Sequence, residues 1–174
     1  QELRNSFELQ ICSTGQHKEL LDQVTELFGI KVDFNLNIMA SSKDLFSVTS
    51  NIISKLKNVL DESKPDLVMV HGDTTTCMAA ALAAFYNKID VAHLEAGLRT
   101  NDIYSPFPEE LNRQIATVIS KIHFAPTELA KQKLIEENIR EADIHVVGNS
   151  VIDSLFMVLP LARKKEFTEE ILKS

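Results

Sequence analysis

At two places in the sequence, a histidine stands two residues before a carboxylate. The first pair is His71 and Asp73, and the second is His93 and Glu95. Carboxylates where strands end can act as general acids or bases, or can bind sugar hydroxyl groups. Two such pairs at neighbouring strand ends would also suit a Zn, Mn or Fe ion. The spacing alone leaves acid–base chemistry and a metallohydrolase site both open.

Each of these carboxylates also has a purely structural interpretation. Asp73 precedes a threonine-rich segment and could serve only as the N-cap of a helix. On a strand, His93 and Glu95 would project to the same side, because side chains alternate along a strand. A glutamate at the end of an apolar strand needs solvent or a partner, and Arg99 or Arg113 could form a structural ion pair with it.

A pair of adjacent carboxylates follows a long loop. Glu109 and Glu110 come directly after a proline, where they suit the positive end of a predicted helix over residues 109–120. Capping alone would explain two glutamates there. The argument for function is convergence, because Glu109 or Glu110 would face the same crevice as Asp73 and Glu95.

Two further segments carry a weaker signal. Gln16 and His17 follow the first predicted strand and could hold a ligand, although a plain turn explains them equally well. Residues 148–150, Gly-Asn-Ser, indicate a glycine turn followed by a helix cap.

Strand-like segments alternate with helical ones along the whole chain. The predicted strands are residues 7–13, 32–36, 66–70, 91–94, 122–125 and 144–147. The predicted helices are residues 18–28, a helix capped by Ser41 or Ser42 that ends near Ser63, and residues 74–86, 109–120, 127–138 and 149–159.

This alternation predicts a Rossmann-like, doubly wound parallel sheet of the α/β class. The continuous apolar run over residues 67–70 predicts a strand buried on both faces of that sheet. Ligands of such sheets bind at the carboxyl ends of the strands, where the residues described above stand.

Composition narrows the class of protein. The chain has 174 residues, 44% of them hydrophobic, and a formal net charge of -7, which suits one globular domain. An acidic chain without a basic block is a poor nucleic-acid binder. No apolar run approaches the roughly 20 residues of a membrane span. The two cysteines, Cys12 and Cys77, are expected to be buried free thiols in a reducing cytoplasm.

Six motifs, taken in order, resemble the non-hydrolysing UDP-N-acetylglucosamine 2-epimerases. They are TGQH at 14–17, VHGDTTT at 70–76, HLEAGLRT at 93–100, SPFPEELNR at 105–113, FAPTE at 124–128 and GNSVIDS at 148–154. The EAGLRT string and the SPFPEE segment favour this branch over the hydrolysing epimerases, in which an EGG-like string follows the fourth strand.

The resemblance implies a reaction and the residues that perform it. UDP-GlcNAc and UDP-ManNAc would interconvert by elimination and re-addition of UDP, with no metal or nicotinamide cofactor. The family's catalytic carboxylates correspond to Asp73, Glu95 and Glu109. The resemblance implies substrate-binding or supporting roles for a second set of residues, namely His71, His93, Arg99, Glu110 and Arg113.

The resemblance also implies partners and organisation. Gln16 and His17 match an allosteric UDP-GlcNAc site of some bacterial members, although Ser42 and Lys43 stand where that site has an arginine. The family implies a cytoplasmic homodimer that supplies ManNAc units for surface polysaccharide.

Residues 1–159 are expected to form the N-terminal domain of a GT-B-like enzyme without its first strand, and 160–174 a linker or the start of an interdomain segment. The C-terminal nucleotide-binding domain is expected to lie outside this chain, so the chain alone should be inactive. The rivals are a hydrolysing epimerase that releases ManNAc and UDP, and a catalytically dead module that binds a sugar nucleotide or a partner.

Overall fold

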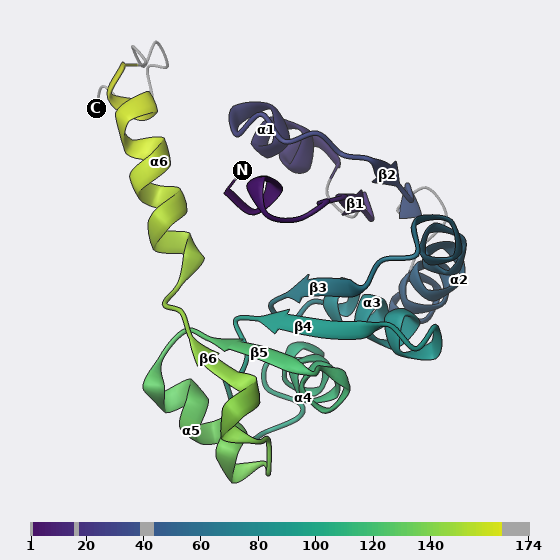
Figure 1. Cartoon of the computed structure of the whole chain (residues 1–174), viewed down its shortest axis with the longest axis vertical. Coiled ribbons are helices and arrows are strands. Elements are labelled where there is room, and N and C mark those ends of the chain that lie inside the picture. Colours follow the sequence, from purple (N-terminus) through teal and green to yellow (C-terminus); the bar gives the residue numbers. More distant parts are fainter. Residues whose placement is uncertain (1, 16–17, 39–43, 165–174) are drawn as a thin grey trace.

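A computed structural model of the chain describes residues 2–15, 18–38 and 44–164 (Figure 1). Parallel sheets flanked by helices confirm the predicted α/β, Rossmann-like architecture. The elements in chain order are η1 Glu2–Asn5, β1 Cys12–Ser13, α1 Lys18–Leu27, β2 Phe34–Asn35, α2 Leu45–Ser63, β3 Leu67–His71, α3 Thr75–Tyr86, β4 Asp90–Leu94, α4 Glu109–Ile119, β5 Ile122–Ala125, α5 Glu128–Glu136, η3 Glu141–Asp143, β6 Ile144–Val146 and α6 Ser150–Lys164.

The strands form two parallel sheets that are not hydrogen-bonded to one another. β3, β4, β5 and β6 make a four-stranded sheet in that order, and β1 pairs with β2. In Figure 1 the small β1–β2 sheet lies apart from β3. The first predicted strand, residues 7–13, is reduced to Cys12 and Ser13, which pair with Phe34 and Asn35.

Helices α3, α4 and α5 cover one face of the four-stranded sheet. Val70 and Val91 pack with Ala81 of α3 and Ala116 of α4 in one cluster of buried residues. A second cluster joins β5 and β6 to Leu134 of α5. The strands pair in register, so these strand residues lie on a single face. A third cluster joins α2 and α3 to the segment after β2.

The opposite face of this sheet is open at β3. Leu67 and Met69 are 40% and 48% exposed, whereas Val70 is buried. The prediction that residues 67–70 are buried on both faces is therefore wrong. Among the described residues, β3 lies at the edge of its sheet and the packed helices cover only its other face.

The sequence predicted the helix ends to within a few residues. The differences lie at the N-cap of α2 and at the C-terminal end of α6. Asp44 caps α2 in a reciprocal capping box with Ser47. The predicted caps, Ser41 and Ser42, lie outside the described residues. α6 continues through Pro160 to Lys164, so the domain boundary predicted after residue 159 falls inside a helix. No helix of the described part is long and apolar enough to cross a membrane.

Gly97 sets how closely the loop after β4 approaches α5. Its φ is +90°, and a Cβ built on it would lie 2.2 Å from the backbone oxygen of Ala130. Gly29 has a φ of +60° but nothing within 4 Å of such a Cβ. Both positions need the left-handed conformation that glycine adopts easily, but only Gly97 also needs the space.

We therefore expect Gly97→Ala to destabilise the protein far more than Gly29→Ala. The strained φ costs about 1–2 kcal/mol in either variant. The clash of Gly97→Ala with a backbone oxygen adds overpacking of about 1–3 kcal/mol. Urea denaturation of both variants measures the difference in free energy of unfolding. Equal losses would show that α5 can move away from residue 97.

Candidate active site

The turn between β3 and α3 brings the two histidine–carboxylate pairs together. Gly72 has a φ of +73°, and its N–H donates to the Leu94 carbonyl of β4 at 3.0 Å. The carbonyl of Gly72 accepts from His93 Nε2 at 2.7 Å and from the Cys77 thiol at 3.1 Å. The backbone of this turn is therefore fixed from β4 and from α3, directly beside Asp73.

Glu95 lies just beyond β4, with a backbone φ of +70°. A glutamate in this left-handed region is uncommon and is the kind of strain that occurs at functional sites. Its Oε2 is 3.4 Å from His71 Nε2 and would be 3.4 Å from a Cβ on Gly72. The prediction that His93 and Glu95 lie on one strand and project to the same side is wrong, because the strand ends at Leu94.

The contacts of Glu95 and Asp73 test the purely structural roles considered for them, an ion pair of Glu95 with an arginine and an N-cap role for Asp73. Glu95 pairs with His71 rather than with either arginine. The N-cap of α3 is Thr74, whose hydroxyl accepts from the Cys77 N–H at 3.2 Å. Asp73 is therefore not the cap, and its half-exposed carboxylate is 2.5 Å from the guanidinium of Arg113.

Glu110 lies on the first turn of α4 and is completely buried. Its carboxylate accepts from the Thr100 N–H at 3.1 Å and from the Gln114 amide at 3.1 Å, and lies 3.4 Å from Arg113 NH1. Burial by itself raises the pKa of Glu110, but these hydrogen bonds and the charge of Arg113 outweigh it and lower the pKa below its ordinary value. Glu110 is thus a carboxylate at neutral pH.

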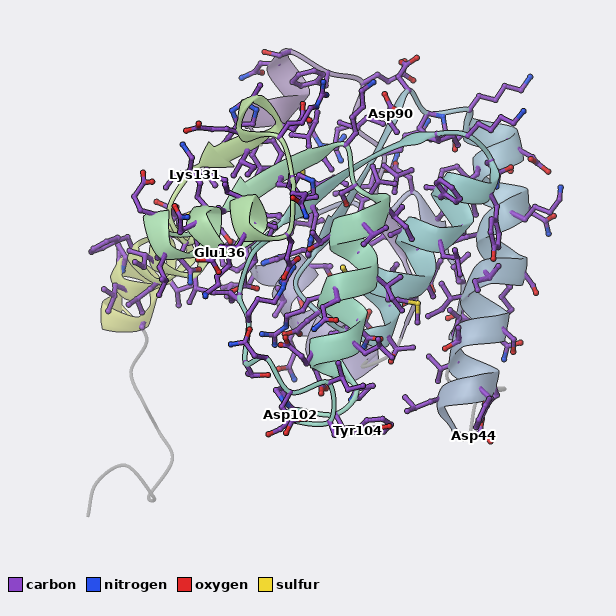
Figure 2. All side chains as sticks on the ribbon, turned by 90° about the horizontal axis from the view of Figure 1, so that it is seen from below. Asp44, Asp90, Asp102, Tyr104, Lys131 and Glu136 are labelled. Carbon is purple, nitrogen blue, oxygen red and sulfur yellow. The ribbon has the colours of Figure 1, made fainter. Side chains whose placement is uncertain are left out.

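The loop after β4 begins with Glu95 and leads to Glu110 on α4. Figure 2 shows Asp102 and Tyr104 in this loop, at the opposite end of the molecule from Asp90, where β4 begins. The prediction that carboxylates follow the carboxyl ends of strands fits this arrangement. Tyr104 stacks on Phe107 with both rings exposed, a feature that the sequence analysis did not single out.

Some predicted residues remain outside this network. Glu109 is partly buried at the start of α4, and its place in the same crevice stays a prediction. Gln16 and His17 lie outside the described residues. A small cavity beside His71 and Glu95 is also lined by residues 148–150, the predicted glycine turn.

Arg99 is buried and forms an ion pair within the protein. Its side chain is 2% exposed and donates to both carboxylate oxygens of Glu137, at 2.6 and 2.8 Å. It also donates to the Thr117 hydroxyl at 2.8 Å. These contacts tie the loop after β4 to α4 and to the end of α5. Nothing in the local sequence around Arg99 points to Glu137, which is 38 residues away.

Two buried histidines form a neutral layer beneath the site. His93 and His123 are register partners on β4 and β5, and are 0% and 1% exposed. Burial lowers the pKa of His93. Burial, followed by the repulsion that two protonated rings would have, lowers the pKa of His123 to about 4. A carbonyl oxygen only accepts, so the neutral ring of His93 donates to Gly72 through Nε2.

The metal interpretation has no geometric support in the part of the chain that the structure describes. No group of three potential ligands among its His, Cys, Asp and Glu side chains converges there. His71 does meet Glu95, but His93 is turned to the Gly72 carbonyl.

Comparison with known proteins gives a consistent family. Residues 1–174 match the family model described as UDP-N-acetylglucosamine 2-epimerase. The chain is 54% identical over 155 residues to UDP-N-acetylglucosamine 2-epimerase of Neisseria meningitidis, covering 89% of this chain and 42% of that protein. It is 48% identical over 174 residues to the enzyme of that name from Campylobacter jejuni, covering 99% of this chain and 45% of that protein.

A solved structure has the same fold. The crystal structure of UDP-GlcNAc 2-epimerase from Neisseria meningitidis bound to UDP-GlcNAc superposes with a TM-score of 0.84, at 54% identity over 88% of this chain and 42% of that chain. The chain thus spans less than half the length of the relatives that it matches.

The buried histidines predict a loss of stability in mild acid. Unfolded His123 takes up a proton near pH 6.5, whereas the folded side chain resists protonation until about pH 4. The free energy of unfolding should therefore fall between those values, by on the order of 2–3 kcal/mol from this group. Urea unfolding from pH 7 to 4.5 should give a shallower decline for His123→Gln than for wild type. The exposed His145→Gln is the control, and equal slopes for all three proteins would contradict the prediction.

Proposed function

The chain belongs to the UDP-N-acetylglucosamine 2-epimerase family, and we propose that the protein interconverts UDP-GlcNAc and UDP-ManNAc by inverting C2 of the sugar. The observation that carries the proposal is the turn at Gly72, with a carboxylate residue next to it in the chain and another next to it in space. Asp73 follows Gly72 in the sequence, and the Glu95 carboxylate, just beyond β4, would lie 3.4 Å from a Cβ on Gly72. The UDP-GlcNAc bound to the Neisseria relative supports the substrate.

The reaction removes and returns one proton and one leaving group. A carboxylate takes the C2 proton, the electrons of the C2–H bond form the C1=C2 double bond, and UDP departs with the electrons of the C1–O bond. UDP oxygen then bonds to C1 again while a proton is delivered to the opposite face of C2. Because the two faces of C2 are involved, two acid–base groups held apart serve the reaction better than one.

Asp73 and Glu95 are the groups that we assign to this proton transfer, with Glu109 as the third catalytic carboxylate. Arg113 orients Asp73, and His71, 3.4 Å from Glu95, can exchange a proton with it. The other residues of the predicted set support the site through contacts with its backbone and side chains. They are His93, Arg99 and Glu110. No step requires a metal or a nicotinamide.

The organisation of the whole protein is part of the proposal. Residues 1–159 belong to the N-terminal domain of a two-domain, GT-B-like enzyme, and α6 leads toward the segment that joins the domains. A second, nucleotide-binding domain completes the cleft. The protein acts as a homodimer in the cytoplasm, in the supply of ManNAc units for polysaccharide, and Gln16 and His17 are the candidate allosteric residues.

Product analysis tests the proposed reaction. The full-length enzyme should convert UDP-GlcNAc into UDP-ManNAc, and in ²H₂O the product should carry deuterium at C2. Release of free ManNAc and UDP would instead assign the protein to the hydrolysing reaction. Binding of UDP-GlcNAc without conversion would make it a binding module.

Loss of either carboxylate should reduce turnover rather than stability. We expect Asp73→Asn and Glu95→Gln to lower kcat by about 100- to 10,000-fold, because each removes a positioned acid or base. Thr74→Ala is the matched control, since it removes only the cap of α3 and costs about 1 kcal/mol of stability. Steady-state kinetics and urea unfolding of the three variants separate the effects. Near-normal turnover of Asp73→Asn would end its assignment.

A further inference from the structure

Arg113 lies between two carboxylates and is oriented by both. NH2 is 2.5 Å from Asp73 Oδ2, and NH1 is 3.4 Å from Glu110 Oε2. The Arg113 side chain is 11% exposed, and its buried Nε has no hydrogen-bond partner within the described residues. The direction of the guanidinium therefore depends on its two terminal nitrogens, one on each carboxylate.

Glu110 is buried more completely than capping requires. A glutamate that only favours the positive end of α4 could remain exposed to solvent, because the interaction with the helix dipole does not need burial. Burying a charge is costly unless it is paired and hydrogen-bonded. Glu110 has three such partners, namely Thr100, Gln114 and Arg113. Its carboxylate thereby links the loop after Glu95 to the arginine that holds Asp73.

We propose that Glu110 is a positioning residue of the active site: its buried carboxylate fixes Arg113 and the Thr100 loop, so that Arg113 holds the Asp73 carboxylate in place. Glu110 does not touch the substrate. This inference rests on the proposed function, because the position of Asp73 matters only if Asp73 performs the proton transfer.

The isosteric variant Glu110→Gln tests the role in the full-length enzyme. It keeps the shape and an acceptor for Thr100, but its neutral amide no longer pairs with the guanidinium. We expect kcat to fall by about 10- to 100-fold, as a misplacement of about 1 Å at a reacting group can cost, while KM changes little. Glu110→Asp keeps the charge on a shorter side chain and should restore part of the lost turnover.

A double-mutant cycle with Asp73→Asn separates positioning from a structural role. If Glu110 acts through Arg113 on Asp73, Glu110→Gln should lower kcat much less in the Asp73→Asn background than in wild type. Glu141→Gln is the control, since it makes the same substitution at an exposed carboxylate that pairs with Lys131 outside this network, and it should leave kcat within about twofold of wild type.

Each outcome decides the question. Wild-type kcat in Glu110→Gln, or equal fold-losses in both backgrounds, would overturn the positioning role while leaving the proposed function intact. An intact wild-type enzyme without epimerisation would overturn both. If Glu110→Gln fails to fold, the same cycle is measured with Glu110→Asp, and the same two results would overturn the role.

Discussion

The turn at Gly72 constrains the rest of the site. Its backbone must turn sharply between β3 and α3, and the N–H and carbonyl that it leaves beside β4 must find partners there. The N–H reaches Leu94, and the carbonyl is held by His93 and Cys77. Any side chain at this position would meet the Glu95 carboxylate. The φ of +73° at Gly72 favours glycine, and the turn that it forms leads directly from β3 to Asp73.

Local sequence rules predicted the elements well, because helix caps and apolar periodicity act over a few residues. Thr127 caps α5 as expected, and α4 begins at Glu109. The same rules could not choose between adjacent capping residues. Asp73 and Thr74 both suit an N-cap, and only the contacts of each side chain show that Thr74 caps α3 while Asp73 faces Arg113.

Other contacts of the site join residues that are far apart in the sequence, and local sequence patterns do not predict such contacts. Arg99 and Arg113 have similar surroundings in the sequence, both near acidic residues. Their partners are 38 and 40 residues away, on different elements. The prediction that β3 is buried on both faces was wrong for a related reason. An apolar strand is covered only where another element packs against it. Helix spacing does explain one pair, since Glu110 and Arg113 are three residues apart on one face of α4.

The charges of the site are arranged by depth. Asp73 and Glu95 reach solvent, whereas beneath them His93 is held neutral by burial. A protonated His93 would add positive charge close to Arg99, and burial already opposes that charge. Burial thus favours the neutral ring, whose Nε2 holds the Gly72 carbonyl. In the proposed reaction, the groups that would change charge are therefore different from the neutral ring that fixes the backbone of the turn.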